Sequence, residues 1–265
     1  FNLRHHNVEV ICADATSFNF PDDVDLIFVD PARRDPRSPK TATGETKRIS
    51  DPEQWSPAWS AIRALAEKFP VMAKVAPGVS DEIIDGWSAG FISINGDLVE
   101  ALLTSFESGR IACLIGPHGE KRFIGGHDTR VSPLGDFLAV PDPALVRARA
   151  LDEIANRIDG GLINEHISWL TSNNEKGAIE LSSLLPRLAQ AFHILEILPF
   201  TPKLLKAQLA KYPASAVTIM SRGVNVDVEQ LRKKISPDLS RTAPEIVVAI
   251  YREDSGNRAI VARRI

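Results

Sequence analysis

The chain has 265 residues and a mass of 29.0 kDa; 44% of its residues are hydrophobic, 25% are charged, and its formal net charge is −3. These values are typical of a globular chain that forms one large domain or two small ones. The sequence contains no run of 18 or more apolar residues, which excludes a membrane-spanning helix. The two cysteines, Cys12 and Cys113, have no Cys or His partner at metal-ligand spacing. We therefore expect no metal site and no disulfide framework, and a cytoplasmic location.

Charge is distributed unevenly along the chain. Residues 201–265 contain twelve Lys or Arg and six acids, a net charge of +6, which leaves −9 for residues 1–200. A basic end on an acidic body is typical of a protein whose end meets a polyanion. The alternative is a solvated surface that happens to be rich in Lys and Arg.

Short apolar runs alternate with helical patterns in the first half of the chain. The expected strands are residues 8–12, 24–29, 71–76, 91–94, 98–106 and 110–115, and the expected helices are 58–69 and 81–87. The run 24–29 is almost continuously apolar, which indicates a parallel strand covered on both faces. The pattern predicts an α/β fold with a doubly wound sheet. The alternative is an α+β fold with an antiparallel meander after residue 90.

The second half begins with a helix that Asp142 caps, with Pro143 at its first position. This helix is expected to run to Ile158 and to end at Gly160-Gly161, and residues 172–182 are expected to form a loop. Further on, the expected strands are 191–198, 216–220, 246–251 and 258–263, and the expected helices are 202–211 and the segment that follows Asp227 to Ile235. Residues 191–265 therefore resemble a compact α+β module.

The run Asp30-Pro31-Ala32-Arg33-Arg34 follows the most apolar predicted strand. Ligands of open α/β sheets bind beyond the carboxyl ends of the strands, where an Asp side chain accepts hydrogen bonds from an amine. Proline has a fixed φ and no N–H, so it holds the neighbouring carbonyl groups in one direction. The alternative is that Asp-Pro only ends the strand and that the arginines are solvated.

Residues 25–34 resemble motif IV of class I S-adenosylmethionine-dependent methyltransferases, and in particular a bacterial subgroup with Asp-Pro-Ala-Arg at this place and a THUMP-like C-terminal domain. Four further stretches are similar to the same family in the same order. They are residues 8–14 as its third strand, residues 48–52 with 55–57 as the loop and helix start after motif IV, residues 74–78 as the end of its fifth strand, and residues 218–224 with 227–234 as the THUMP-like signature.

The resemblance implies a domain order. Residues 1–135 would form the C-terminal half of a Rossmann-like methyltransferase sheet, residues 136–190 a helical connector, and residues 191–265 a small THUMP-like α+β domain. The family holds its cofactor with a Gly-rich loop, but no such loop precedes Asp14, and Gly125-Gly126 and Gly160-Gly161 come too late in the chain. The chain is therefore expected to be a fragment truncated at its N-terminal side, which alone binds S-adenosylmethionine weakly or not at all.

The resemblance also implies site residues. Catalytic roles fall to Asp30, Pro31 and Arg33, cofactor contacts to Asp14, Ala15 and Asp30, and substrate contacts to Arg33, Arg34, Lys74, Arg222 and Arg232. The tetrapeptide of related amino-methylating enzymes has a second proline and an aromatic residue where this chain has Ala32 and Arg33. An Arg plane stacks on a base or grips a phosphate. Alternatives remain at two positions, since Asp14 could instead cap its own turn and Lys74 could extend to the surface.

RNA is the partner that the resemblance implies, because THUMP-type modules bind RNA in related enzymes. The alternative function is a binding module without catalysis, in which the basic C-terminal domain engages nucleic acid or protein. Without the upstream strands, the strand 24–29 would have an open apolar edge. We expect that edge to pair with residues 8–12, to be covered by another chain, for instance in a homo-oligomer, or to fray.

Overall fold

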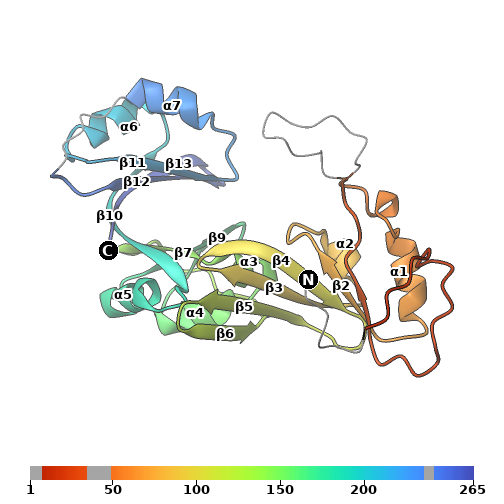
Figure 1. Cartoon of the computed structure of the whole chain (residues 1–265). Coiled ribbons are helices and arrows are strands. Elements are labelled where there is room, and N and C mark those ends of the chain that lie inside the picture. Colours follow the sequence, from red (N-terminus) through yellow and green to blue (C-terminus); the bar gives the residue numbers. More distant parts are fainter. Residues whose placement is uncertain (1–7, 35–48, 236–241) are drawn as a thin grey trace. The chain divides into compact units, whose positions relative to one another are not determined.

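The computed structural model describes residues 8–34, 49–235 and 242–265 and contains two β-sheets (Figure 1). The chain divides into two compact units, Phe1–Ala89 with Ala101–Ser108, and Gly90–Glu100 with Gly109–Ile265. Among the described residues, no helix has both the length and the apolar character needed to cross a bilayer.

The first sheet has six strands. They are β1 (Ile27–Val29), β2 (Val71–Val75), β3 (Ser88–Ile94), β4 (Asp97–Thr104), β5 (Arg110–Gly116) and β6 (Gly119–Ile124), in the order β1-β2-β4-β3-β5-β6. β1 and β2 are parallel, whereas β2 and β4, and also β5 and β6, are antiparallel. Asn95 and Gly96 join β3 to β4 with positive φ angles of 54° and 94°, as a two-residue hairpin turn requires. The hairpins β3–β4 and β5–β6 are therefore present beside one parallel pair, but β5 neighbours β3 rather than β4, so the antiparallel meander given as the alternative after residue 90 is not formed.

One face of β1 and β2 forms the core of the first unit. The alternate residues Ile27 and Val29 are 7% and 9% exposed, and every second residue of β2 is fully buried. The helical segments here are η1 (Pro52–Gln54), α1 (Trp59–Ala66) and α2 (Asp81–Ile84), of which α1 contacts β2. On the other face, Phe28 is 56% exposed. The expectation that this strand is covered on both faces is therefore not met within the described residues.

Residues 8–12 do not form the predicted strand; they are exposed and adopt no regular structure. β1 is the end strand of its sheet and has three residues rather than the six expected, and among the described residues no strand pairs with its outer edge. A β-branched run forms a strand only where a neighbour accepts its backbone hydrogen bonds and covers its side chains. Of the outcomes expected for this edge, pairing with residues 8–12 is therefore wrong, and covering by another chain stays a prediction.

The second sheet has seven strands and lies in the second unit. Its strands are β7 (Phe137–Pro141), β8 (Gly161–Asn164), β9 (Ile167–Ser172), β10 (Ala189–Pro199), β11 (Val217–Arg222), β12 (Ile246–Glu253) and β13 (Gly256–Arg264), in the order β11-β12-β13-β10-β7-β9-β8. The long strand β10 pairs with β7 through residues 189–193 and with β13 through residues 192–199. It therefore continues one sheet from the C-terminal strands into the segment before them.

The C-terminal strands are covered on both faces. The helices α6 (Pro202–Leu209) and α7 (Val228–Ile235) lie on one face of β11, β12 and β13 (Figure 1). Their buried side chains, among them Leu205 and Leu231, pack against alternate residues of β12 such as Val248. The other set of β12 residues, including Val247 and Ala249, packs on the opposite face with β7 and β9 residues. The β-α-β-α-β-β order predicted for residues 191–265 is present in this part of the chain.

Residues 136–190, which were expected to be helical, also contain β7, β8 and β9. The predicted helix through Ile158 is two helices, α3 (Pro143–Ala148) and α4 (Leu151–Arg157), because Arg149 between them has a left-handed φ of 57°. The segment expected as a loop contains α5 (Glu175–Ser183), whose N-cap Asn174 accepts a hydrogen bond from the backbone N–H of Gly177 at 3.0 Å. The polar residues at the start of α5 explain why the sequence predicted a loop here, since Asn and Gly also favour turns.

Gly125, Gly160 and Gly161 lie where another part of the chain approaches their backbone closely. A Cβ added to Gly125 would overlap the backbone carbonyl of Ala148, at the end of α3, and one added to Gly160 would overlap the carbonyl of Thr171 in β9. Glycine is needed where another backbone approaches this closely.

Candidate functional site

The carboxylate of Asp30 lies beside the ammonium group of Lys74 at one edge of the first sheet. Val29 pairs with Ala73 in the parallel register of β1 and β2, so the residues that follow them are level. Lys74 Nζ donates a hydrogen bond to Asp30 Oδ2 at 3.3 Å, and the two side chains are 36% and 51% exposed. Since parallel strands end at the same edge, the fold brings together two residues that are 44 positions apart. Both remain accessible to a ligand.

The loop after Asp30 is held by backbone hydrogen bonds. The N–H of Ala32 donates to the carbonyl of Ser56 at 2.8 Å, and the N–H of Ser56 donates back to Ala32 at 3.1 Å. The N–H of Ile49 donates to the carbonyl of Arg33 at 2.8 Å. Pro31 is buried between the strand and these contacts, while Arg33 is half-buried. The segment around residues 49–56 therefore fixes the direction of the loop, which the sequence resemblance did not reveal.

Three buried tryptophans support the segment around residues 49–56. Trp55, Trp59 and Trp87 are 8%, 3% and 8% exposed, and their ring centroids are 6.3 Å apart for the first pair and 5.1 Å for the second. The indole N–H of Trp55 donates to the carbonyl of Ile49 at 3.1 Å. Edge-to-face and tilted contacts of this kind add to the burial energy of the rings. The tryptophans thus pack the loop against α1.

Asp14 caps its own turn. Its Oδ1 accepts hydrogen bonds from the backbone N–H of Thr16 at 2.9 Å and from the Thr16 hydroxyl at 2.7 Å. The hydroxyl bond, followed by the backbone bond, lowers the pKa of Asp14 below its ordinary value of 3.8. Asp14 and Ala15 are exposed in this turn, and a contact of either residue with adenine stays a prediction.

The predicted substrate residues fall in different parts of the chain. Arg33, Arg34 and Lys74 belong to the first unit with Asp30, whereas Arg222 and Arg232 belong to the second. Arg222 ends β11 and is exposed. Arg232 is exposed on α7 together with Lys233 and Lys234, while Leu231 and Ile235 of the same helix are buried. The three cations therefore lie on the side of α7 opposite its buried residues.

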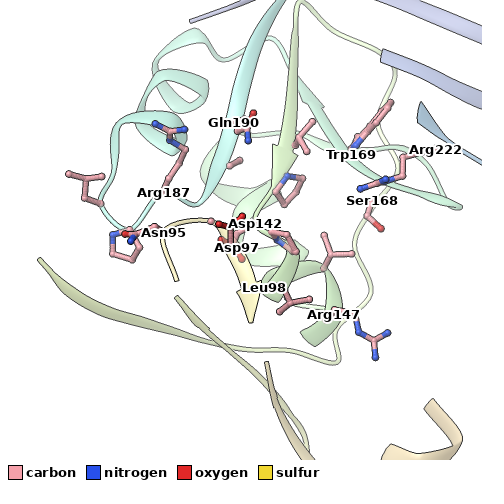
Figure 2. A pocket seen from close by; sticks show the side chains of 18 of the residues that line it. Asn95, Asp97, Leu98, Asp142, Arg147, Ser168, Trp169, Arg187, Gln190 and Arg222 are labelled. Carbon is pink, nitrogen blue, oxygen red and sulfur yellow. The ribbon is translucent and has the colours of Figure 1, made fainter. Parts of the chain in front are cut away.

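A pocket in the second unit was not foreseen from the sequence (Figure 2). It has a volume of about 570 Å³, within the roughly 300–1,000 Å³ common for ligand sites. Its lining residues are 95–98, 140–143, 146–147, 168–169, 185–187 and 189–190, together with Pro117 and Arg222. Each segment is short and none carries a motif. The only signals in the sequence were the Asp142-Pro143 helix start and Arg222.

Asp142 forms part of the wall of this pocket and is 5% exposed. Its Oδ2 accepts a hydrogen bond from the Ser93 hydroxyl at 2.7 Å, and its Oδ1 accepts one from the N–H of Ala144 at 2.8 Å. Burial nevertheless raises the pKa of Asp142 above the ordinary 3.8, because desolvation outweighs these two bonds. Both carboxylate oxygens of Asp142 therefore accept hydrogen bonds within the protein, which gives this residue a structural role.

In the part of the chain that the structure describes, no group of three or more His, Cys, Asp or Glu side chains is arranged to hold a metal ion. Cys12 is exposed and Cys113 is partly exposed, and both are free thiols.

Comparison with known proteins supplies the family context. Residues 189–264 match the family described as THUMP domain-like. Over 238 residues, 85% of this chain, the sequence is 26% identical to an uncharacterized S-adenosylmethionine-dependent methyltransferase of Mycobacterium tuberculosis, found in strains CDC 1551 and H37Rv. The chain spans 60% of the length of those relatives.

A solved structure has a similar fold. The crystal structure of a protein described as a candidate methyltransferase from Porphyromonas gingivalis W83 matches with a TM-score of 0.63 and 17% identity, over 91% of this chain and 59% of that one. The predicted resemblance to S-adenosylmethionine-dependent methyltransferases with a THUMP-like C-terminal domain is confirmed by these comparisons, as is the mixed α/β fold class.

Proposed function

We propose that this chain is the part of an S-adenosylmethionine-dependent methyltransferase that receives the target molecule, and that the target is RNA. The observation that carries the proposal is the Asp30–Lys74 pair, 3.3 Å apart at the carboxyl edge of parallel strands, in a chain related to proteins with that name. The THUMP-like match and the basic face of α7 favour RNA as the substrate.

The residues present are compatible with the cofactor. The carboxylate of Asp30 is about half exposed where ligands of such sheets bind, and Asp14 presents an exposed carboxylate in a fixed turn. Asp14 and Ala15 would contact its adenosine part, and Asp30 would lie toward its reactive end. When bound, S-adenosylmethionine supplies an activated methyl group on a sulfonium ion.

The chain's own residues would then position the acceptor. Asp30 accepts a hydrogen bond from the N–H or O–H group to be methylated, and Lys74 holds that carboxylate in place from the neighbouring strand. Arg33 stacks on a base or binds a phosphate. Since the methyl group is already activated, positioning of this kind provides most of the rate enhancement available to the protein.

The chain by itself would hold the cofactor poorly. No Gly-rich loop precedes Asp14, and the relatives are longer than this chain. The exposed edge of β1, with Phe28 56% exposed, is a surface that upstream residues or a second copy would cover. The full methyltransferase would work in the cytoplasm, consistent with its free thiols.

Calorimetric titration of S-adenosylmethionine tests the proposal. We expect saturable binding to a version extended by the native upstream residues, and at least tenfold weaker binding to the present chain. In the extended protein, Asp30→Ala should lower methyl transfer to RNA by about 100-fold or more, because positioning and charge at the acceptor are lost. Asp25→Ala removes an exposed carboxylate before β1 and should leave transfer within twofold. Equal losses in both variants, or no binding by the extended protein, would refute the proposal.

A second candidate function is binding without catalysis. It is favoured by the three consecutive cations on α7, all exposed above a buried apolar face. Replacing Arg232, Lys233 and Lys234 by Glu should abolish RNA binding, and the affinity of the unchanged protein should fall steeply with salt. RNA binding by an extended protein that shows no cofactor binding would favour this function over methyl transfer.

A further inference from the structure

The pocket in the second unit does not contain the Asp30–Lys74 pair, on which the proposed methyl transfer rests. Asp30 and Lys74 belong to the first unit, whereas every residue that lines this pocket belongs to the second. We propose that this pocket is a separate nucleotide site, which binds the base and phosphate of a single nucleotide, either free or as one unit of a single-stranded RNA.

Two arginines at the pocket supply the groups that would bind a phosphate. Arg187 and Arg222 are exposed and come from different elements, the segment before β10 and the end of β11. Arg187 Nε donates to the carbonyl of Ser182 at 3.0 Å, and Arg222 Nη1 donates to the carbonyl of Ser221 at 3.4 Å. A guanidinium group has five N–H donors in a planar fork, so each arginine keeps donors that can form paired bonds with phosphate oxygens.

A third guanidinium adds positive charge. Arg147 lines the pocket from the end of α3, with its Cζ 4.9 Å from the centre of the Phe91 ring. The acids at the pocket are Asp97 and Asp142, and both oxygens of Asp142 already accept hydrogen bonds inside the protein. With three arginines and two acids, the lining carries a net positive charge, which favours binding of an anion.

The rest of the lining suits a flat ring with polar edges. Leu98, Val140 and the buried Trp169 form the apolar part of the wall, and four of the lining residues are prolines. The amide side chains of Asn95 and Gln190 lie at the same pocket, as Figure 2 shows. Bases of single-stranded nucleic acids are recognised by apolar contact with their faces and by hydrogen bonds to their edges. An anion without a ring would leave the apolar surface unused, and an uncharged hydrophobic ligand would leave the arginines unused.

Hydrogen bonds made by the segments that line the pocket favour a preformed site. The N–H of Asp142 donates to the carbonyl of Leu188 at 2.9 Å, which ties the start of α3 to the segment that carries Arg187. Gln190 Oε1 accepts a hydrogen bond from Arg264 Nη1 at 3.2 Å, so its amide is also held. A site whose side chains are fixed before binding loses less entropy when the ligand arrives.

Calorimetry with AMP, UMP and adenosine on the present chain tests the proposal. We expect saturable binding of AMP or UMP, at least tenfold weaker binding of adenosine, and a loss of about tenfold for Arg222→Ala and for Arg187→Ala. The matched control is Arg122→Ala, an exposed arginine of β6 that does not line the pocket and should change affinity less than twofold.

Leu98→Trp gives an independent test because it fills the pocket from a half-buried position. It should abolish nucleotide binding while the circular dichroism spectrum stays unchanged; if it does not fold, the arginine variants decide. Absence of saturable binding by both nucleotides, equal binding of adenosine, or the same loss in Arg122→Ala and Arg222→Ala would overturn the proposal. A six-nucleotide oligouridylate distinguishes the sources. Binding at least tenfold tighter than UMP that Leu98→Trp or Arg187→Ala weakens assigns the pocket to RNA, whereas equal or weaker binding, or tighter binding that both variants retain, assigns the pocket to a free nucleotide.

Discussion

Replacement of Asp142 separates its role as a helix cap from the cost of burying its charge. In Asp142→Ala the helix α3 loses its N-cap, which costs about 1 kcal/mol, and the Ser93 hydroxyl loses its acceptor in a buried place, which costs roughly 1–3 kcal/mol. We expect a decrease of about 3 kcal/mol in the free energy of unfolding. For a unit of this size, that is a decrease of roughly 6–12 °C in Tm.

Asp142→Asn is the matched variant. Asparagine also caps helices well, and its amide carries an oxygen for the Ala144 N–H without a charge to bury. We expect its free energy of unfolding to lie within about 1 kcal/mol of the original at pH 7. Urea unfolding followed by circular dichroism measures both variants. Equal losses in the two variants, or a loss below about 0.5 kcal/mol in Asp142→Ala, would refute this account of the residue.

The same pair of proteins tests the direction of the pKa shift. Burial raises the pKa of Asp142 above 3.8, so its carboxyl group holds a proton more tightly in the folded chain than in the unfolded chain. The stability this gives is fully present below pH 3.8 and is lost as the pH rises through the pKa of the folded state. From pH 4 upward, Asp142→Asn should therefore gain stability relative to the original chain. A change in the opposite direction would mean that the hydrogen bonds from Ser93 and Ala144 outweigh desolvation.

Three further outcomes follow from the packing. Gly125→Ala should lower the free energy of unfolding by about 3 kcal/mol or more, because the new Cβ overlaps the Ala148 carbonyl. Gly78→Ala, whose new Cβ meets no atom within 4 Å, should change it by less than about 1 kcal/mol, and thermal unfolding compares the two variants. Lys74→Ala should change stability by less than about 1 kcal/mol in urea unfolding, since its ion pair is half exposed, and a larger loss would show that the pair is structural. Phe28→Asp should be nearly neutral in this chain and should destabilise the version extended by upstream residues; equal effects in both would contradict the proposed covering of β1.

The C-terminal module shows how much of a fold the local sequence pattern can predict. In residues 191–265 the strands alternate regularly or run apolar between clear turn signals, and Thr201 and Asp227 cap the helices through side-chain bonds of 3.2 and 3.0 Å. Each of these signals lies within a few residues of the element it defines, so the elements there were predicted to within two or three residues at each end. Within the segment before them, β7, β8 and β9 were missed. The partners of β7, which are β9 and β10, lie far along the chain, whereas β8 and β9 pair as a local hairpin that the sequence analysis did not identify.

The candidate sites divide in the same way. The sequence by itself determined the fold class, the resemblance to methyltransferases and the motif Asp30-Pro31, because a strand, its ending and its motif are contiguous in the chain. Only the tertiary structure decided that Lys74 reaches Asp30, that Ser56 fixes the loop after it, and that residues 8–12 do not pair with β1. The nucleotide pocket likewise exists only in the folded chain, since its arginines come from separate elements. Pairing across a sheet and packing around a cavity join residues distant in sequence, and the local periodicity of a single sequence carries no record of such contacts.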